Sequence, residues 1–142
     1  MHPIWYSDIY TDGLATTIRF PRERYRMLYK MLTVYHGKRI CFLEPEPIAT
    51  KYLYFAHQQD YVDRFITNQL TSVEKRRIGL RPWTEQIQDR TLRITNGTLL
   101  ATKHVLEHKG IAGNLSGGTH HAHYDYGSGY CIFNDIAISV RY

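Results

Sequence analysis

The chain has 142 residues, of which 43% are hydrophobic and 22% charged, a composition typical of a folded globular protein and not of a disordered one. A chain of this length is expected to form one domain, and no apolar run is long enough to cross a bilayer. The formal net charge of +5 would suit an acidic partner, but the basic residues are scattered, so we expect no direct nucleic-acid binding and no membrane partner.

The two cysteines and the first residues of the chain favour a cytoplasmic location. Cys41 and Cys131 are far apart and fit neither a disulfide framework nor a Cys-x-x-Cys site. A reducing compartment is therefore expected. Residues 1–6 lack the basic region and the apolar run of a signal peptide.

The first predicted elements alternate between strand and helix. A short strand is expected over residues 4–6. Pro21 and Gly37 then bound a predicted amphipathic helix, whose apolar positions recur at helical spacing: Tyr25, Leu28, Leu32 and Tyr35. The apolar run 39–43 is followed by a proline-rich loop, which suits a buried parallel strand.

Two short helices are predicted next. Helical spacing of apolar residues marks the first of them: Tyr61, Val62, Phe65, Ile66 and Leu70. Thr71 and Glu74 have the spacing of a capping box, which predicts that a second short helix begins there and ends by Gly79.

A longer helix is predicted from Thr84, as the N-terminal cap, to Lys109, with Gly110 as its C-terminal stop. The dipeptide at 96–97 would favour a hairpin, but no alternation of apolar and polar residues flanks it. We therefore retain the helix, at a cost of about 1 kcal/mol for an interior glycine.

The last predicted elements enclose the most unusual part of the sequence. A strand is expected over residues 111–115, and a final helix begins at Asn134 or Asp135, with an apolar side formed by Ile136, Ala137 and Val140. Strands that alternate with helices indicate an α/β fold with a largely parallel sheet. Open sheets of this kind bind ligands beyond the carboxyl ends of their strands, which is where the segment 117–133 would lie.

That segment carries two adjacent histidines, His120 and His121, between glycine-rich stretches. Successive side chains of a strand point to opposite faces, so both imidazoles can serve one reacting atom only if the loop has an unusual shape. Glycines accept positive φ and let a substrate approach the backbone, which supplies that shape. The alternative is a surface turn without chemistry.

The strings Gly-Gly-Thr-His-His-Ala at 117–122 and Gly-Tyr-Cys-Ile-Phe-Asn-Asp at 129–135 resemble the histone deacetylase family, and its bacterial and class IV branch in particular. Weaker resemblance runs upstream through residues 57–62, 77–80 and 97–101, so it covers nearly the whole chain. It implies a three-layer arginase/deacetylase-like fold with a mainly parallel sheet. Because the family's domain is about twice as long, residues 1–142 are expected to be its N-terminal half, a truncated form of the catalytic domain.

The resemblance also implies roles for residues of the loop. His121 would be the general base and acid of amide hydrolysis, and His120 would act electrostatically. The Gly129 carbonyl would accept a hydrogen bond from the substrate amide, and Tyr130, where the family more often has Phe, would line the acyl-lysine tunnel. The expected substrate is an acetylated protein or a small acetylated amine, such as acetyl-lysine or an acetylpolyamine.

An internal cavity behind the metal is the last feature implied, with Arg26, Gly117, Gly118 and Cys131 as its candidate residues. Zinc is the expected cofactor of the complete enzyme, but the family's metal ligands lie further along than Tyr142. We therefore expect no metal ligands and no bound zinc in this chain, which alone would be inactive and would need a C-terminal half as partner. The alternative is a non-catalytic deacetylase-like binding or assembly protein.

Other polar residues of these segments have a structural interpretation. His57 and Asp60 are expected to cap and position a helix, and Asn134 and Asp135 to cap the last one. His120, His121 and His123 form a cluster that would suit a divalent ion on its own, but in the family the histidine pair does not ligate zinc.

Overall fold

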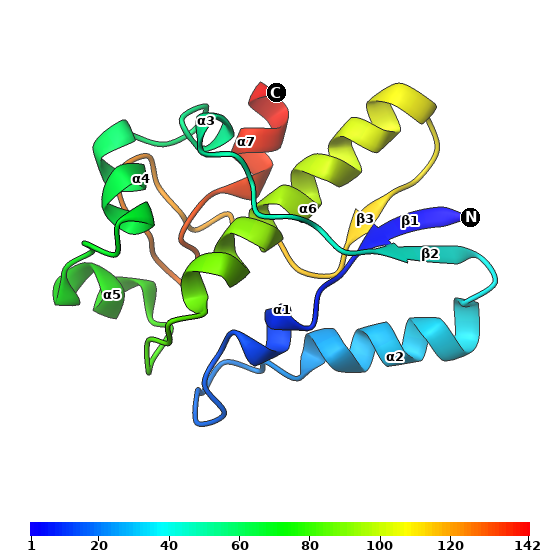
Figure 1. The fold of residues 1–142 in the computed structure, drawn as a ribbon, viewed down its shortest axis with the longest axis horizontal. Helices are drawn as coiled ribbons and strands as arrows, with labels where there is room; N and C mark the ends of the chain where they lie inside the picture. Colours follow the sequence, from blue (N-terminus) through cyan, green and yellow to red (C-terminus); the bar gives the residue numbers. More distant parts are fainter.

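A three-stranded parallel sheet forms one side of the molecule. The computed structural model describes all residues from Met1 to Tyr142, with strands in the order β2-β1-β3 (Figure 1): β1 (His2–Trp5), β2 (Ile40–Leu43) and β3 (Gly113–Asn114). In the central strand, Ile4 is paired with Phe42 on one side and Gly113 on the other. The predicted α/β class and the parallel pairing are confirmed.

The strands differ from the predictions in burial and length. β2 is an edge strand and only half-buried, so its prediction as a buried strand is wrong in that respect. The strand predicted over 111–115 is reduced to β3, because the chain leaves the sheet at once to enter the glycine-rich loop.

The helices are α1 (Ile9–Asp12), α2 (Arg24–His36), α3 (Thr50–Leu53), α4 (Gln59–Ile66), α5 (Ser72–Ile78), α6 (Ile87–His108) and α7 (Asp135–Arg141). The longest, α6, contacts β1, β3 and α7, while α2 contacts β2. Figure 1 shows α6 and α2 on opposite sides of the strands. No helix combines the length and the apolar character needed to cross a membrane.

The capping box of α5 forms as predicted. The Thr71 hydroxyl accepts from the backbone N–H of Glu74 at 3.2 Å, and the Glu74 carboxylate accepts from the Thr71 N–H at 2.8 Å. Gly79 then ends the helix in the left-handed region, with φ of 88°. This stop directs the chain toward the glycine-rich loop, where the N–H of Tyr130 donates to the Ile78 carbonyl at 2.7 Å.

The predicted start of the long helix is wrong by two residues, because the N-terminal cap is Gln86 and not Thr84. Thr84 does not cap it, because its hydroxyl donates to the Gly13 carbonyl at 2.7 Å, and α6 begins at Ile87 instead. Gly97 does lie inside α6, as predicted. A Cβ built on Gly97 would lie 2.6 Å from the Asn114 side-chain nitrogen, so the glycine permits close packing of α6 on β3.

The predicted apolar faces of three helices need correction. Of the predicted α2 stripe only Tyr25 is buried, whereas Leu28 and Tyr35 are exposed. Leu70 is buried but follows α4, which ends at Ile66. On α7 the buried apolar residue is Ile138, whereas Ile136 and Val140 are exposed, because α7 packs on α6 through the face that also carries Asp135.

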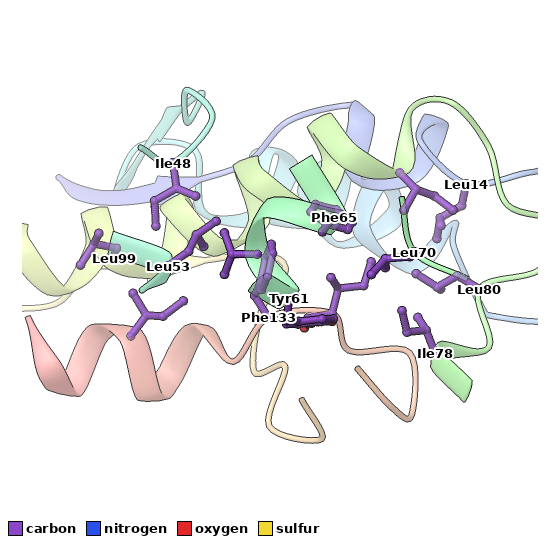
Figure 2. Packing of buried hydrophobic residues seen from close by; sticks show 14 residues of the cluster. Leu14, Ile48, Leu53, Tyr61, Phe65, Leu70, Ile78, Leu80, Leu99 and Phe133 are labelled. Atoms are coloured by element: carbon purple, nitrogen blue, oxygen red, sulfur yellow. Dashed lines mark hydrogen bonds between the residues drawn. The ribbon is translucent and has the colours of Figure 1, made fainter. Parts of the chain in front are cut away.

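The main core lies among the helices and not on the sheet. Figure 2 shows its 14 buried residues, which we call the main core: Leu14, Ile48, Leu53, Tyr61, Val62, Phe65, Leu70, Ile78, Leu80, Ile87, Leu99, Ile132, Phe133 and Ile138. The Tyr61 hydroxyl donates to the Ile132 carbonyl at 2.9 Å, which ties α4 to the end of the glycine-rich loop. A second, smaller cluster beside the sheet contains Tyr6, Tyr10, Tyr25 and Ile94.

Candidate active site

The candidate site is the loop between β3 and α7, whose shape depends on residues with positive φ. Gly117 and Gly118 have φ of 122° and 67°, and further along Gly129 and Tyr130 have φ of 53° and 68°. Left-handed backbone is accessible to glycine without strain but rare for a residue such as tyrosine. The loop therefore makes two sharp changes of direction, one on each side of the histidine pair.

One buried carboxylate fixes the start of this loop. Asp135 is fully buried and accepts from the N–H groups of Gly118 and Thr119 at 2.9 and 2.8 Å. It also accepts from the Thr98 hydroxyl at 2.6 Å and from the Thr119 hydroxyl at 2.8 Å. Because a carboxylate is a strong acceptor and these donors come from α6 and the loop, Asp135 holds the two together. Its predicted role as a helix cap is wrong, since Asn134 caps α7 and the Asp135 carboxylate binds α6 and the loop instead.

Gly117 is required by that arrangement. A Cβ at this position would lie 2.6 Å from both the Asp135 carboxylate and the Thr98 hydroxyl. Nothing lies within 4 Å of a Cβ built on Gly118. Gly117 thus makes room for the Asp135 carboxylate, while the space next to Gly118 stays open.

The two imidazoles lie next to each other and are exposed. Their ring centroids are 4.2 Å apart, with 40° between the planes. Nδ1 of His120 lies 2.7 Å from the Gly118 carbonyl. Since a carbonyl oxygen only accepts, Nδ1 carries the hydrogen, and Nε2 of the neutral ring keeps its lone pair. Neither imidazole forms an ion pair with an acidic side chain of this chain.

Gly129 lies beside His121, and Tyr130 follows Gly129 in the chain. A Cβ on Gly129 would lie 3.0 Å from Cγ of His121, so only glycine allows this approach. The Tyr130 ring packs edge-on against Phe20 with centroids 5.1 Å apart, and it remains 47% exposed. An open hollow of about 810 Å³ is lined by Gly129, Tyr130, Phe20 and Gly79.

Cys131, the residue after Tyr130, is buried. Its thiol lies 3.4 Å from the Gly129 carbonyl, to which it donates, and burial raises its pKa. A thiol with a raised pKa stays protonated near neutral pH and is a poor nucleophile. It lines neither the hollow beside Gly129 nor the hollow at the free edge of β3.

The other candidate cavity residues do not all come together. Gly117 and Gly118 line a second open hollow of about 800 Å³ at the free edge of β3. The arginine that lines it is Arg24, whose Nη2 donates to the Tyr25 hydroxyl at 3.0 Å. Arg26 does not line it, and its guanidinium instead pairs with the Asp12 carboxylate at 2.5 Å.

Helix geometry explains why Arg24 and Arg26 diverge. Residues two apart on a helix are about 200° apart around its axis, so only one of them can face the sheet edge. The spacing of two acidic residues in the sequence could have indicated that Arg26 forms ion pairs. Asp8 and Asp12 are four residues apart, and their side chains both lie within 3.7 Å of Arg26.

His57 joins the far end of the loop to α4. Its Nε2 accepts from the Asn134 N–H at 2.9 Å, and its Nδ1 lies 3.3 Å from the Tyr124 carbonyl, to which it donates. Burial lowers the pKa of this imidazole, which favours the neutral form that both hydrogen bonds require. Asn134 caps α7, since its side-chain oxygen accepts from the Ala137 N–H at 3.0 Å. The cap role expected of Asn134 is confirmed. The cap role expected of His57 is wrong, because its ring bonds the backbone of the loop and of Asn134 and does not cap α4.

The chain contains no group of three or more His, Cys, Asp or Glu side chains arranged to hold a metal ion. His123 in particular stacks on Tyr126, with ring centroids 4.4 Å apart. The residues present therefore do not fit a zinc site by themselves.

The model of the histone deacetylase domain matches residues 19–142, and the chain belongs to this family. An uncharacterized protein of Picosynechococcus is 38% identical over 142 residues, which cover 98% of this chain and 46% of that protein. The chain thus spans about half the length of this relative.

Shorter matches link the chain to named members of the family. The acetoin utilization protein AcuC of Bacillus subtilis is 40% identical over 50 residues, which cover 34% of this chain and 13% of that protein. Histone deacetylase 8 of Xenopus laevis is 40% identical over 60 residues, which cover 42% of this chain and 18% of that protein. The resemblance that the loop suggested is confirmed.

Proposed function

We propose that residues 1–142 are the N-terminal part of a histone deacetylase-like catalytic domain and supply its acid–base groups. The observation that carries the proposal is the anchored loop, in which Asp135 fixes Gly118 and Thr119 and thereby presents His120 and His121 side by side. Membership of the deacetylase family supports hydrolysis of an acetylated amine.

Hydrolysis of an amide needs a base that takes a proton from the attacking water and an acid that gives one to the departing amine. Imidazole can do both near neutral pH. We assign these transfers to His121, whose ring lies against Gly129, and Gly129 in turn lines the hollow that would receive the substrate. His120 would act electrostatically, with its ring oriented by the Gly118 carbonyl.

Zinc belongs to this proposal as a cofactor of the complete domain, where it would polarise the acetyl carbonyl and activate water. Its ligands would come from sequence outside residues 1–142. The chain alone is therefore expected to be inactive. The substrate would be acetyl-lysine in a protein or a small acetylated amine, and a cytoplasmic location stays a prediction.

A non-catalytic assembly protein is the second candidate, and the open edge of the sheet favours it. The hollow at β3 has apolar walls from both α2 and α6, including Leu28, Val105 and Leu106. An unpaired parallel strand beside such a hollow is a site for another polypeptide segment.

A chimera separates the two candidates. Residues 1–142 would be joined to the part of the Picosynechococcus relative that follows its matched region, and acetate release from acetyl-lysine peptides would be measured. We expect turnover that His121→Ala reduces by about 10²-fold or more, the scale for loss of a general acid–base group. The exposed His123 on the same loop provides the control, since His123→Ala should retain activity.

Two results would contradict the proposal. A folded chimera without turnover would favour the assembly protein. Zinc-dependent turnover by residues 1–142 alone, abolished by His121→Ala, would show that this chain is catalytically sufficient.

A further inference from the structure

The hollow beside Gly129 and Tyr130 is lined by three arginines from separate segments. Arg19 precedes α2, Arg77 lies in the last turn of α5, and Arg81 follows that helix. We call these three residues the arginine rim. No acidic side chain lines the hollow with them.

The charges of the arginine rim are not neutralised within the chain. The ion pairs of arginine involve four other residues, Arg22, Arg26, Arg64 and Arg93, and each of these contacts at least one carboxylate. Arg77 lies over the Tyr126 ring, 4.7 Å from its centroid, and Arg81 donates to the Arg76 carbonyl at 3.2 Å. These contacts orient two of the guanidinium groups and leave their charge available.

The aromatic wall of the hollow suits the neutral part of a lysine side chain. Phe20 and Tyr130 pack against each other there, and a pair of rings offers an apolar surface to a methylene chain. The arginine rim therefore surrounds the position at which the carrier of the acylated amine would emerge.

We propose that the arginine rim binds carboxylates on the residues next to an acetylated lysine, an inference that rests on the proposed function. A guanidinium presents a planar fork of donors that matches a carboxylate. Three unpaired positive charges would repel the remaining ammonium groups of an acetylpolyamine. The substrate class is accordingly acetyl-lysine in an acidic peptide and not a cationic small amine.

Binding of labelled peptides to the protein, followed by fluorescence anisotropy at low salt, tests this without requiring turnover. The peptides carry acetyl-lysine between glutamates, acetyl-lysine between lysines, unmodified lysine between glutamates, or succinyl-lysine between glycines. We expect about tenfold tighter binding of the acetylated acidic peptide than of the acetylated basic one, the sum of three exposed ion pairs. The preference should shrink in 1 M salt, where the screening length is about 3 Å.

Variants of the rim make the test specific. Arg77→Gln combined with Arg81→Gln should remove most of the preference, whereas Arg76→Gln, on the same helix but outside the hollow, should keep it. Arg77→Glu combined with Arg81→Glu should reverse the preference toward the basic peptide. Because these residues are exposed, their replacement should leave the circular dichroism spectrum unchanged.

Each contrary result has its own meaning. Equal binding of the acidic and basic acetylated peptides would contradict the proposed role of the arginine rim and leave the proposed function intact. Tightest binding of succinyl-lysine would place the carboxylate on the acyl group and overturn the assignment to flanking residues. Equal binding of acetylated and unmodified acidic peptides would count against the proposed function itself, since the rim would then bind anions without recognising an acetylated lysine.

Discussion

The helical region around the main core and the sheet region around β3 bury their apolar side chains to different extents. In the helical region 14 residues form one buried cluster that includes Phe133 and Ile138, next to the anchor of the histidine loop. In the sheet region the buried cluster has four members, and α2 carries exposed apolar residues at 27, 28, 31, 34 and 35.

The two regions therefore contribute differently to the candidate site. The groups that shape the histidine loop belong to the helical region: Thr98 of α6, His57 before α4, and Asp135 of α7. The sheet region contributes an unpaired edge and an open hollow. The loop is thus shaped within residues 1–142, whereas the surface next to it is where a further part of the proposed domain would pack.

Replacement of the ring at the centre of the main core should have the largest effect on stability. Phe133 is 1% exposed, so Phe133→Ala should lower the free energy of unfolding by about 3–5 kcal/mol through lost burial and a cavity. Val34 on α2 is 76% exposed, and Val34→Ala should change it by less than about 0.5 kcal/mol. Urea denaturation measures both, and similar values would break the contrast between the regions.

Removal of the buried Asp135 carboxylate should have the second largest effect on the free energy of unfolding. Asp135→Ala leaves the donors of Thr98, Gly118 and Thr119 without their acceptor, which should lower the free energy of unfolding by about 3 kcal/mol. Asp125 is exposed on the same loop, so Asp125→Ala is the matched control. If both variants unfold at the same denaturant concentration, the anchor role of Asp135 is wrong.

A methyl group at the contact between α6 and β3 should destabilise the fold by about 1–2 kcal/mol. Gly97→Ala would ordinarily favour a helix, but here its Cβ meets the Asn114 side chain. That side chain is held by hydrogen bonds to Tyr10, to the Ile94 carbonyl and to Thr98, so it cannot simply move away. In an Asn114→Ser background the substitution should become neutral or stabilising, and a double-mutant cycle measures the difference.

The smallest effect should be a dependence on pH. Burial holds the pKa of His57 below the ordinary 6.5, so the unfolded chain takes up a proton at a higher pH than the folded one. Stability from this residue is present above about pH 6.5 and falls as the pH drops toward the folded pKa, by at most about 1.4 kcal/mol per pH unit. Comparison of urea melts at pH 7.5 and pH 5.5 should show a smaller loss for His57→Gln than for the wild type.

Local patterns in the sequence predicted the elements whose ends depend on neighbouring residues. The capping box at Thr71 and the cap at Asn134 are formed by side chains and backbone groups three residues apart. The α/β class followed from the alternation of elements, and the family followed from the loop strings.

Long-range contacts account for what the sequence did not predict. Thr84 was unavailable as a cap because Gly13, 71 residues earlier, receives its hydroxyl. Burial of Ile138 instead of Val140 depends on how α7 meets α6. The same holds for Arg24, since only the position of α2 next to the sheet edge decides which arginine faces the hollow.

The left-handed backbone at Tyr130 bears on how such a site can vary. A non-glycine residue there is strained by about 1–2 kcal/mol, and the backbone is held by the Ile78 carbonyl at 2.7 Å and by the hydrogen bond from Ser128 N–H to the Cys131 carbonyl at 2.9 Å. Insertions between Ser128 and Cys131 would break these hydrogen bonds, which hold Gly129 against His121. Diversification of substrate preference would therefore proceed by exchange of one ring at this position, with the length of the loop unchanged and the imidazoles left in place.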